Sequence, residues 1–262
     1  MKRHTSLLMA MIAASILLFF LLNLLIGSVD IPLSSVVNIL LGGEEQSVVW
    51  QNIVLKSRVP QALTALVAGA GLSISGLQMQ TVFRNPLAGP SVLGISSGAS
   101  LGVAFAVLIS GSIGGVALSN MGYFGEMALT ISATIGAFAV MAIIVYVSQK
   151  VRGNVTLLII GVMIGYVANA IIGVLKYFSV EEDIRAYVIW GLGSFSRVSG
   201  DQMVLFVCLM LVLMPLSFLL IKTMNLLLLG DSYARNLGLH IKRARLLVIV
   251  CSGVLVAIVT AY

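Results

Sequence analysis

The stretch RVPQALTALVAGAGLSISGLQMQTVFRNPLAGPSVLGISSGASLG, residues 58–102, holds 25 consecutive uncharged residues at 59–83. At about 1.5 Å per residue, a helix of this length crosses a hydrocarbon core of about 30 Å. Arg58 and Arg84 bracket the run, and Pro86 and Pro90 follow it, so the helix is expected to stop there and the chain to return as a second apolar helix. We therefore predict a transmembrane hairpin whose structural turn is Arg84, Asn85 and Pro86.

The composition of the whole chain is also that of a membrane protein. Of its 262 residues, 60% are hydrophobic and 9% are charged, and the mean hydropathy is +1.12. Soluble domains carry about a quarter charged residues. Further uncharged runs occupy residues 5–29, 127–149, 153–175, 202–221 and 246–262. With the two helices of the hairpin, we expect an all-α, polytopic transmembrane helical bundle of about seven spans.

The basic residues indicate the orientation of these spans. With the N-terminus in the cytoplasm, ten Lys and Arg fall in inner segments and five in outer ones, which agrees with the positive-inside rule. The net charge of +6 is spread over these loops and forms no single basic face, so nucleic acid is not an expected partner. Membrane lipid is.

Four motifs of the quoted stretch occur together and in order. They are Arg58-Val59-Pro60, the small-residue run 68–76, the turn at residues 83–88 and the glycine- and serine-rich helix start at residues 94–99. In this combination the chain resembles the FecCD/BtuC-like permease family of ABC importers, which carry iron-siderophore complexes, haem and vitamin B12.

The resemblance implies a BtuC-like type II ABC importer permease. It implies a homodimer in a bacterial or archaeal cytoplasmic (inner) membrane, with two ATP-binding subunits and an extracytoplasmic substrate-binding protein. Members of the family have about ten spans, and the last uncharged run here is short. We therefore expect residues 1–262 to be one permease domain that is incomplete at its C-terminal end.

A second informative stretch is GDSYARNLGLHIKRAR, residues 230–245. Asp231 or Ser232 can cap a short helix, Gly238 can end it in a left-handed turn, and a basic segment leads into the next span. The segment resembles the family's loop that docks on the ATPase. The residues assigned to this contact are Asp231, Ser232, Ala234, Arg235, Gly238, Lys242 and Arg243. The alternative is a basic loop lying on anionic lipid.

Two further sets of residues are candidates for contact with partner or substrate. Arg58 is predicted to dock the substrate-binding protein at the outer surface, with help from Lys56, because the family pairs an arginine at this place with a carboxylate. The alternative for Arg58 is an interfacial anchor. A stripe at every fourth position, Gly161, Gly165, Asn169 and Gly173, is a candidate lining of the translocation path, with helix packing as the alternative.

The sequence contains no motif for bond chemistry. It lacks a phosphate-binding GxxxxGK[ST] loop, a His pair with metal-ligand spacing and a plausible catalytic triad. We therefore expect no catalytic residues, no metal and no cofactor, and an energy source in another chain. A stand-alone channel or an ion-coupled secondary transporter is the alternative. The spans carry no ionisable residue near their middle, which counts against an ion-coupled carrier.

Overall fold

The computed structural model describes residues 2–43, 47–109, 123–151, 153–195, 198 and 200–262, and the regular elements in these ranges are all helical. They are α1 (Lys2–Leu25), α2 (Leu33–Leu40), α3 (Val48–Ile53), η1 (Val54–Arg58), α4 (Val59–Phe83), α5 (Ile95–Ala104), η2 (Phe105–Ile109), α7 (Tyr123–Lys150), α8 (Asn154–Tyr177), α9 (Glu181–Gly191), α10 (Gly200–Phe218), α11 (Ile221–Leu228), α12 (Asp231–Asn236) and α13 (Ile241–Ala261). The elements η1 and η2 are short π-helical segments. The predicted all-α class is confirmed.

Six helices in the described ranges are long and apolar enough to cross a membrane. They are His4–Leu25, Val48–Phe83, Phe124–Lys150, Val155–Tyr177, Gly200–Phe218 and Ile241–Ala261. The seventh predicted span falls on Ile95–Ile109, which at 15 residues is about 22 Å long. The continuation of that run, residues 110–122, lies outside the described residues. The predicted count of seven is therefore not confirmed.

The described residues divide into two compact units, one of residues 1–68 and 195–207 and one of residues 69–194 and 208–262. In the first unit, Leu24, Ile31, Val36, Ile39, Val54 and Ala62 form a small core. This core packs the end of α1, helix α2 and the start of α4. Most of α1 exposes apolar side chains, such as Met9 and Phe19 at 69% each, as expected of a helix that lies in lipid.

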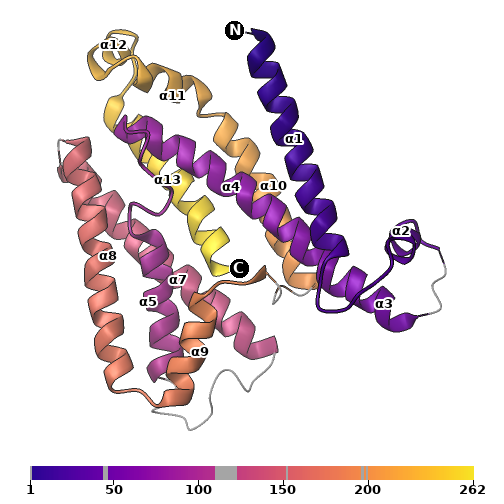
Figure 1. Cartoon of the computed structure of the whole chain (residues 1–262). Helices are drawn as coiled ribbons and strands as arrows, with labels where there is room; N and C mark the ends of the chain where they lie inside the picture. Colours follow the sequence, from indigo (N-terminus) through magenta and orange to yellow (C-terminus); the bar gives the residue numbers. More distant parts are fainter. Residues whose placement is uncertain (1, 44–46, 110–122, 152, 196–197, 199) are drawn as a thin grey trace. The chain divides into compact units, whose positions relative to one another are not determined.

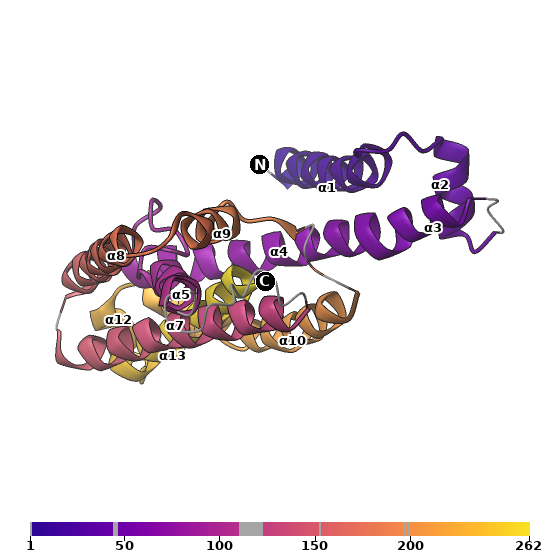
Figure 2. The same ribbon diagram turned by 90° about the horizontal axis from the view of Figure 1, so that it is seen from below.

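In the second unit, α5 and α7 cross with their backbones in contact (Figures 1 and 2). A Cβ atom on Gly102 would lie 2.1 Å from the Ser132 carbonyl oxygen, and one on Gly136 would lie 2.2 Å from the Gly98 carbonyl oxygen. Any side chain at these glycines would push the helices apart. The glycines of α5 thus allow the two helix backbones to approach closely.

Helices α4 and α13 run beside each other, joined by a buried pair of hydroxyl groups (Figure 1). The Oγ atoms of Ser75 and Ser252 are 2.5 Å apart, and each is 3.3 Å from the other residue's carbonyl oxygen. Hydroxyls satisfied across a helix interface hold apolar helices together where the hydrophobic effect does not.

Helix α10 carries Pro215 within its last turns and ends at Phe218. Proline removes a backbone N–H and clashes with the carbonyl four residues earlier, which weakens the helix at this point. After residues 219 and 220, the chain resumes as the short helix α11. The chain therefore leaves α10 through a break and enters α11, which leads to the segment at residues 230–245.

Candidate functional site

The segment after α11 folds as the short helix α12 between two glycines. Gly230 has a φ of 109° and Gly238 a φ of 84°, in the left-handed region that favours glycine. Gly238 N–H donates to Arg235 O at 2.9 Å and Leu239 N–H to Ala234 O at 3.0 Å, which is a Schellman ending. The left-handed turn predicted at Gly238 is confirmed. The predicted cap is wrong, because Gly230 is the N-cap residue and the Asp231 carboxylate points elsewhere.

The residues predicted to dock the ATPase do not all reach the surface. Ser232, Arg235, Gly238, Lys242 and Arg243 are exposed, but Ala234 is fully buried in the core of the second unit. Because Ala234 lies on the inner face of α12, its side chain cannot touch another subunit. The prediction that Ala234 contacts the ATPase is therefore wrong.

The exposed face of α12 carries two residues that sequence reasoning missed. Tyr233 is 57% exposed and Leu237 is 56% exposed. Tyr233 lies within α12, and Leu237, four positions on, is the C-cap residue that follows the helix. In the sequence this spacing could not be told from that of residues buried in a core. Arg235 is two positions from Tyr233, so the two side chains leave α12 on different sides, with the buried Ala234 between them. The surface of α12 and its C-cap therefore exposes both apolar and basic side chains, which is a composition that protein partners bind.

The Asp231 carboxylate pairs with two arginines from distant parts of the chain. Arg84 Nη2 donates to Asp231 Oδ1 at 2.5 Å, and Arg245 Nη2 donates to Asp231 Oδ2 at 2.6 Å. The Arg84 guanidinium also donates to Leu227 O, from Nε at 3.2 Å and from Nη2 at 2.9 Å. The Asp231 carboxylate therefore joins three segments: the start of α12, the turn after α4 and the first turns of α13. Arg84 connects this group to the end of α11.

The turn at Arg84, Asn85 and Pro86 is ordered by side chains on both sides. Leu87 N–H donates to Asn85 Oδ1 at 2.9 Å, and Gln80 Nε2 donates to Pro86 O at 3.2 Å. Arg84 has a φ of +49° and is the one non-glycine residue with positive φ in the described ranges. A side chain in this conformation is disfavoured, and helix ends normally use glycine there.

Arg58 lies inside the first unit and not on its surface. The residue is 5% exposed, and its guanidinium donates to Leu24 O and Leu25 O, each at 2.9 Å, and to Val29 O at 2.5 Å. Leu24 O and Leu25 O belong to the last turn of α1, whose carbonyls have no helical partners, and Val29 O lies four residues beyond the helix. The prediction that Arg58 presents a free guanidinium to a binding protein is wrong, because that group caps α1. Lys56, its predicted helper, is exposed.

The predicted path stripe on α8 divides into two parts. Gly161 is buried against the loop that follows the hairpin turn, and Gly165 against the start of α5: a Cβ on Gly161 would lie 2.9 Å from Leu93 Cα, and one on Gly165 would lie 3.3 Å from Ser97 Oγ. These two glycines therefore pack α8 closely against its neighbours. Asn169 and Gly173 are exposed.

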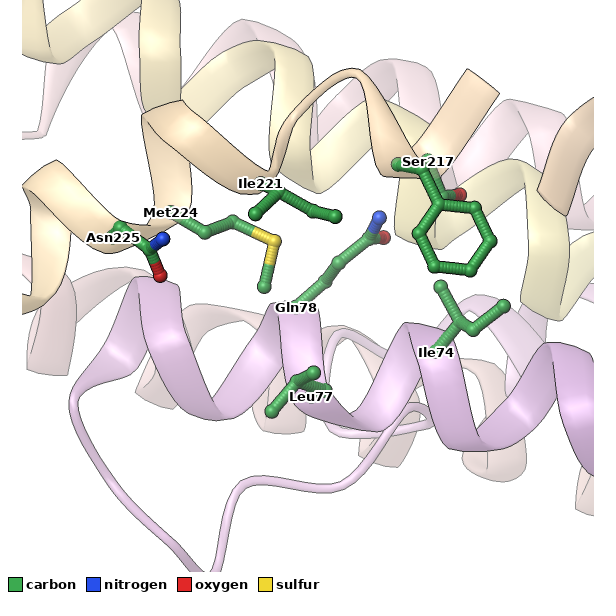
Figure 3. A pocket seen from close by; sticks show the side chains of 8 residues that line it. Ile74, Leu77, Gln78, Ser217, Ile221, Met224 and Asn225 are labelled. Atoms are coloured by element: carbon green, nitrogen blue, oxygen red, sulfur yellow. The ribbon is translucent and has the colours of Figure 1, made fainter. Parts of the chain in front are cut away.

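A recess of about 170 Å³ lies between α4 and the break that joins α10 to α11 (Figure 3). Its lining is Ile74, Leu77, Gln78, Ser217, Phe218, Ile221, Met224 and Asn225. Gln78 reaches from α4 toward Ser217, and its Oε1 is buried without a hydrogen-bond partner among the described residues. Sites for drug-sized ligands measure roughly 300–1,000 Å³. The recess is therefore too small for a metal chelate. The described residues also contain no group of three His, Cys, Asp or Glu that could hold a metal ion.

Comparison with known proteins matches most of this chain to one family. The profile of the FecCD transport family matches residues 15–262. The chain is 34% identical over 214 residues to a hemin transport system permease protein of Yersinia pestis, of which it spans 61%, using 81% of its own length. It is 38% identical over 205 residues to a probable iron chelatin transport system permease protein of Helicobacter pylori, with 77% of this chain and 58% of the other aligned.

A vitamin B12 import system permease protein of Klebsiella pneumoniae is 34% identical over 219 residues, covering 84% of this chain and 63% of that protein. The chain thus spans about three fifths of the length of these relatives. Among solved structures, an inward-facing transporter of the metal-chelate ABC type matches with a TM-score of 0.77 and 29% identity, over 94% of this chain and 72% of the other.

Proposed function

Because the chain belongs to the FecCD transport family, we propose that it forms the membrane-spanning permease of an ABC importer for an iron chelate, haem or cobalamin. The permease works as a homodimer with two ATP-binding subunits and receives its substrate from an extracytoplasmic binding protein. It carries out no bond chemistry itself. Its N-terminus lies in the cytoplasm.

The observation that carries this proposal is the exposed face of α12. A transporter that works alone has no need for a short helix held between two glycines with Tyr233, Arg235 and Leu237 turned outward. A motor subunit that pushes on the permease needs such a surface, and α12 is joined directly to the ends of α4 and α13. We assign the ATPase contact to this face, together with Ser232, Lys242 and Arg243.

The arrangement of the polar ends supports the proposed topology. Arg84, Asp231 and Arg245 meet at one end of the second unit, as they must if both the hairpin turn and the docking loop are cytoplasmic. Lys56, exposed in η1 of the first unit, remains a candidate contact of the binding protein. Asn169 and Gly173, exposed on α8, remain candidates for the translocation path.

The test is reconstitution with transport. The tagged full chain is purified in mild detergent with the subunits that accompany it and reconstituted in liposomes. Uptake of a radiolabelled iron hydroxamate, haemin and cyanocobalamin is then measured with and without ATP. We expect uptake of one probe that requires ATP and the binding protein. Uptake that proceeds without ATP, either passively or on an ion gradient, would identify a channel or a secondary transporter.

A charge reversal tests the assigned surface. Arg235→Glu is expected to lower ATP-dependent uptake at least tenfold and to reduce recovery of the ATP-hydrolysing subunit. Lys222→Glu is the matched control, because Lys222 is also exposed and basic but lies at the start of α11. Equal uptake by both variants would show that α12 is not the docking surface.

A further inference from the structure

We infer that Asp231 is a positioning residue that latches α12 to Arg84 and Arg245, so that displacement of the docking helix moves the ends of α4 and α13 with it. This inference rests on the proposed function, because it concerns how force on α12 reaches the membrane helices. It takes Asp231 out of the docking surface, where sequence analysis placed it, and makes it an internal link.

The geometry of the Asp231 carboxylate suits a link between two helices. Each oxygen of the carboxylate accepts from a different arginine, one from the turn after α4 and one from the second turn of α13. Charge-assisted bonds on both oxygens fix the plane of the carboxylate and not only its distance. Movement of Asp231 in any direction therefore pulls on at least one of the two arginines.

The backbone at Gly230 joins α11 to α12 in a left-handed conformation, with a φ of 109°, and a Cβ atom there would have no neighbour within 4 Å. Gly230 N–H donates to Leu227 O at 3.4 Å, and Gly230 O accepts from Ala234 N–H at 2.9 Å. Arg84 spans this joint, since it donates to Leu227 O on α11 and to Asp231 on α12. Without the arginine, the buried side chain of Ala234 still holds α12 to the core, but the ion pair no longer ties the start of α12 to the turn after α4.

The backbone conformation of Arg84 also supports a role for its side chain. Glycine would adopt its left-handed conformation without penalty, and an arginine there is disfavoured. A position that served only to end α4 would gain from glycine. The arginine is explained by its guanidinium, which makes all of the contacts described above.

The two ion pairs of Asp231 can transmit movement of α12 while contributing little to the stability of the fold. The side chains are between 21% and 39% exposed, and ion pairs at such exposure contribute little to stability. Loss of the carboxylate charge should therefore leave the helices packed and affect mainly the position of α12. This separates the proposed role from a merely structural one.

The first experiment measures the position of α12 in the purified full chain in nanodiscs. Cys208 and Cys251 are replaced, and spin labels are attached at Ser232 on α12 and at Leu87 in the hairpin turn, both exposed. We expect one narrow distance distribution in the otherwise unchanged protein. Asp231→Asn and Arg84→Gly should each at least double its width, whereas Lys222→Gln, which changes an exposed cation on α11, should not.

The second experiment measures coupling in the reconstituted complex, as substrate molecules imported per ATP hydrolysed. The probe is whichever of the three named compounds the unaltered complex imports. Asp231→Asn and Arg84→Gly should lower this ratio at least fivefold while ATP hydrolysis continues. The double variant should be no worse than either single variant, because both break the same link.

The outcomes separate this inference from the proposed function. Broadened distances with an unchanged coupling ratio, or unchanged distances in both variants, would overturn the latch and leave the importer assignment standing. Effects of the two variants that multiply would also overturn it. An unaltered complex that imports no probe with ATP would refute the proposed function, whereas the distance measurement would still report on the link.

Discussion

Replacement of Arg58 by methionine should free the end of α1 from the start of α4. Methionine keeps most of the apolar volume of the side chain but removes all three bonds to carbonyl oxygens. A hydrogen bond to a charged group contributes roughly 1.5–3 kcal/mol when buried, and a neutral, solvated one about 0.5–1.5 kcal/mol. The outcome depends on which carbonyls can find water once the guanidinium is gone.

The burial of the three carbonyl groups decides how much free energy the substitution costs. Leu24 is 3% exposed, so its carbonyl is left without a partner, which costs about 2 kcal/mol. Leu25 is half-buried and Val29 is 38% exposed, so water can replace those bonds at a cost of about 0.5 kcal/mol each. The expected loss is about 3 kcal/mol, or a factor of roughly 150 in the opening equilibrium at about 1.36 kcal/mol per tenfold.

Hydrogen exchange of the backbone amides in residues 24–31, read by mass spectrometry, measures this local opening. Arg58→Met should exchange about 150-fold faster, and Arg58→Lys should lie between Arg58→Met and the unaltered protein, since an ammonium group lacks the fork that binds three oxygens at once. Lys56→Met, at an exposed position two residues away, is the control and should change nothing. Normal exchange in Arg58→Met, combined with weaker binding of the substrate-binding protein, would refute the capping role and restore the docking assignment.

Two further substitutions test the packing of the second unit. Gln78→Met removes a buried amide oxygen that has no partner among the described residues, together with the long hydrogen bond of 3.7 Å from Gln78 Nε2 to Cys251 Sγ. It should therefore raise the free energy of unfolding in detergent by about 1 kcal/mol, and a lower melting temperature would show that the amide oxygen has a partner. Gly102→Ala places a Cβ 2.1 Å from Ser132 O and should cost about 3 kcal/mol, whereas Gly69→Ala, with nothing within 4 Å of its Cβ on an exposed face of α4, should be neutral or stabilising. Equal melting temperatures for the two alanine variants would contradict the α5–α7 contact.

Several features of the fold could be predicted because they depend on local signals. Arg58 and Arg84 mark the bounds of α4, and Pro86 marks the turn, since charge and proline act on the residues beside them. Gly238 ends α12 for the same reason. The seventh span is not confirmed, because its uncharged run continues into residues 110–122, which lie outside the described residues.

The errors concern contacts between residues far apart in the sequence. Nothing near Arg58 indicates that the carbonyls of residues 24–29 lie within its reach. Likewise, Asp231 looks like a helix cap until Arg84 and Arg245 are seen beside it. For the stripe on α8, spacing places four residues on one face, but only the packed loop shows that Gly161 and Gly165 are covered.

The crossing of α5 and α7 limits how this unit can change shape. Most helix pairs can slide by letting the side chains between them change rotamer, but Gly98, Gly102 and Gly136 leave no such layer. Rotation or translation there would drive one backbone into the other. The two helices must therefore move as one rigid body. Any opening of the second unit has to take place at its other helix interfaces, such as the one between α4 and α13, where two hydroxyl groups meet.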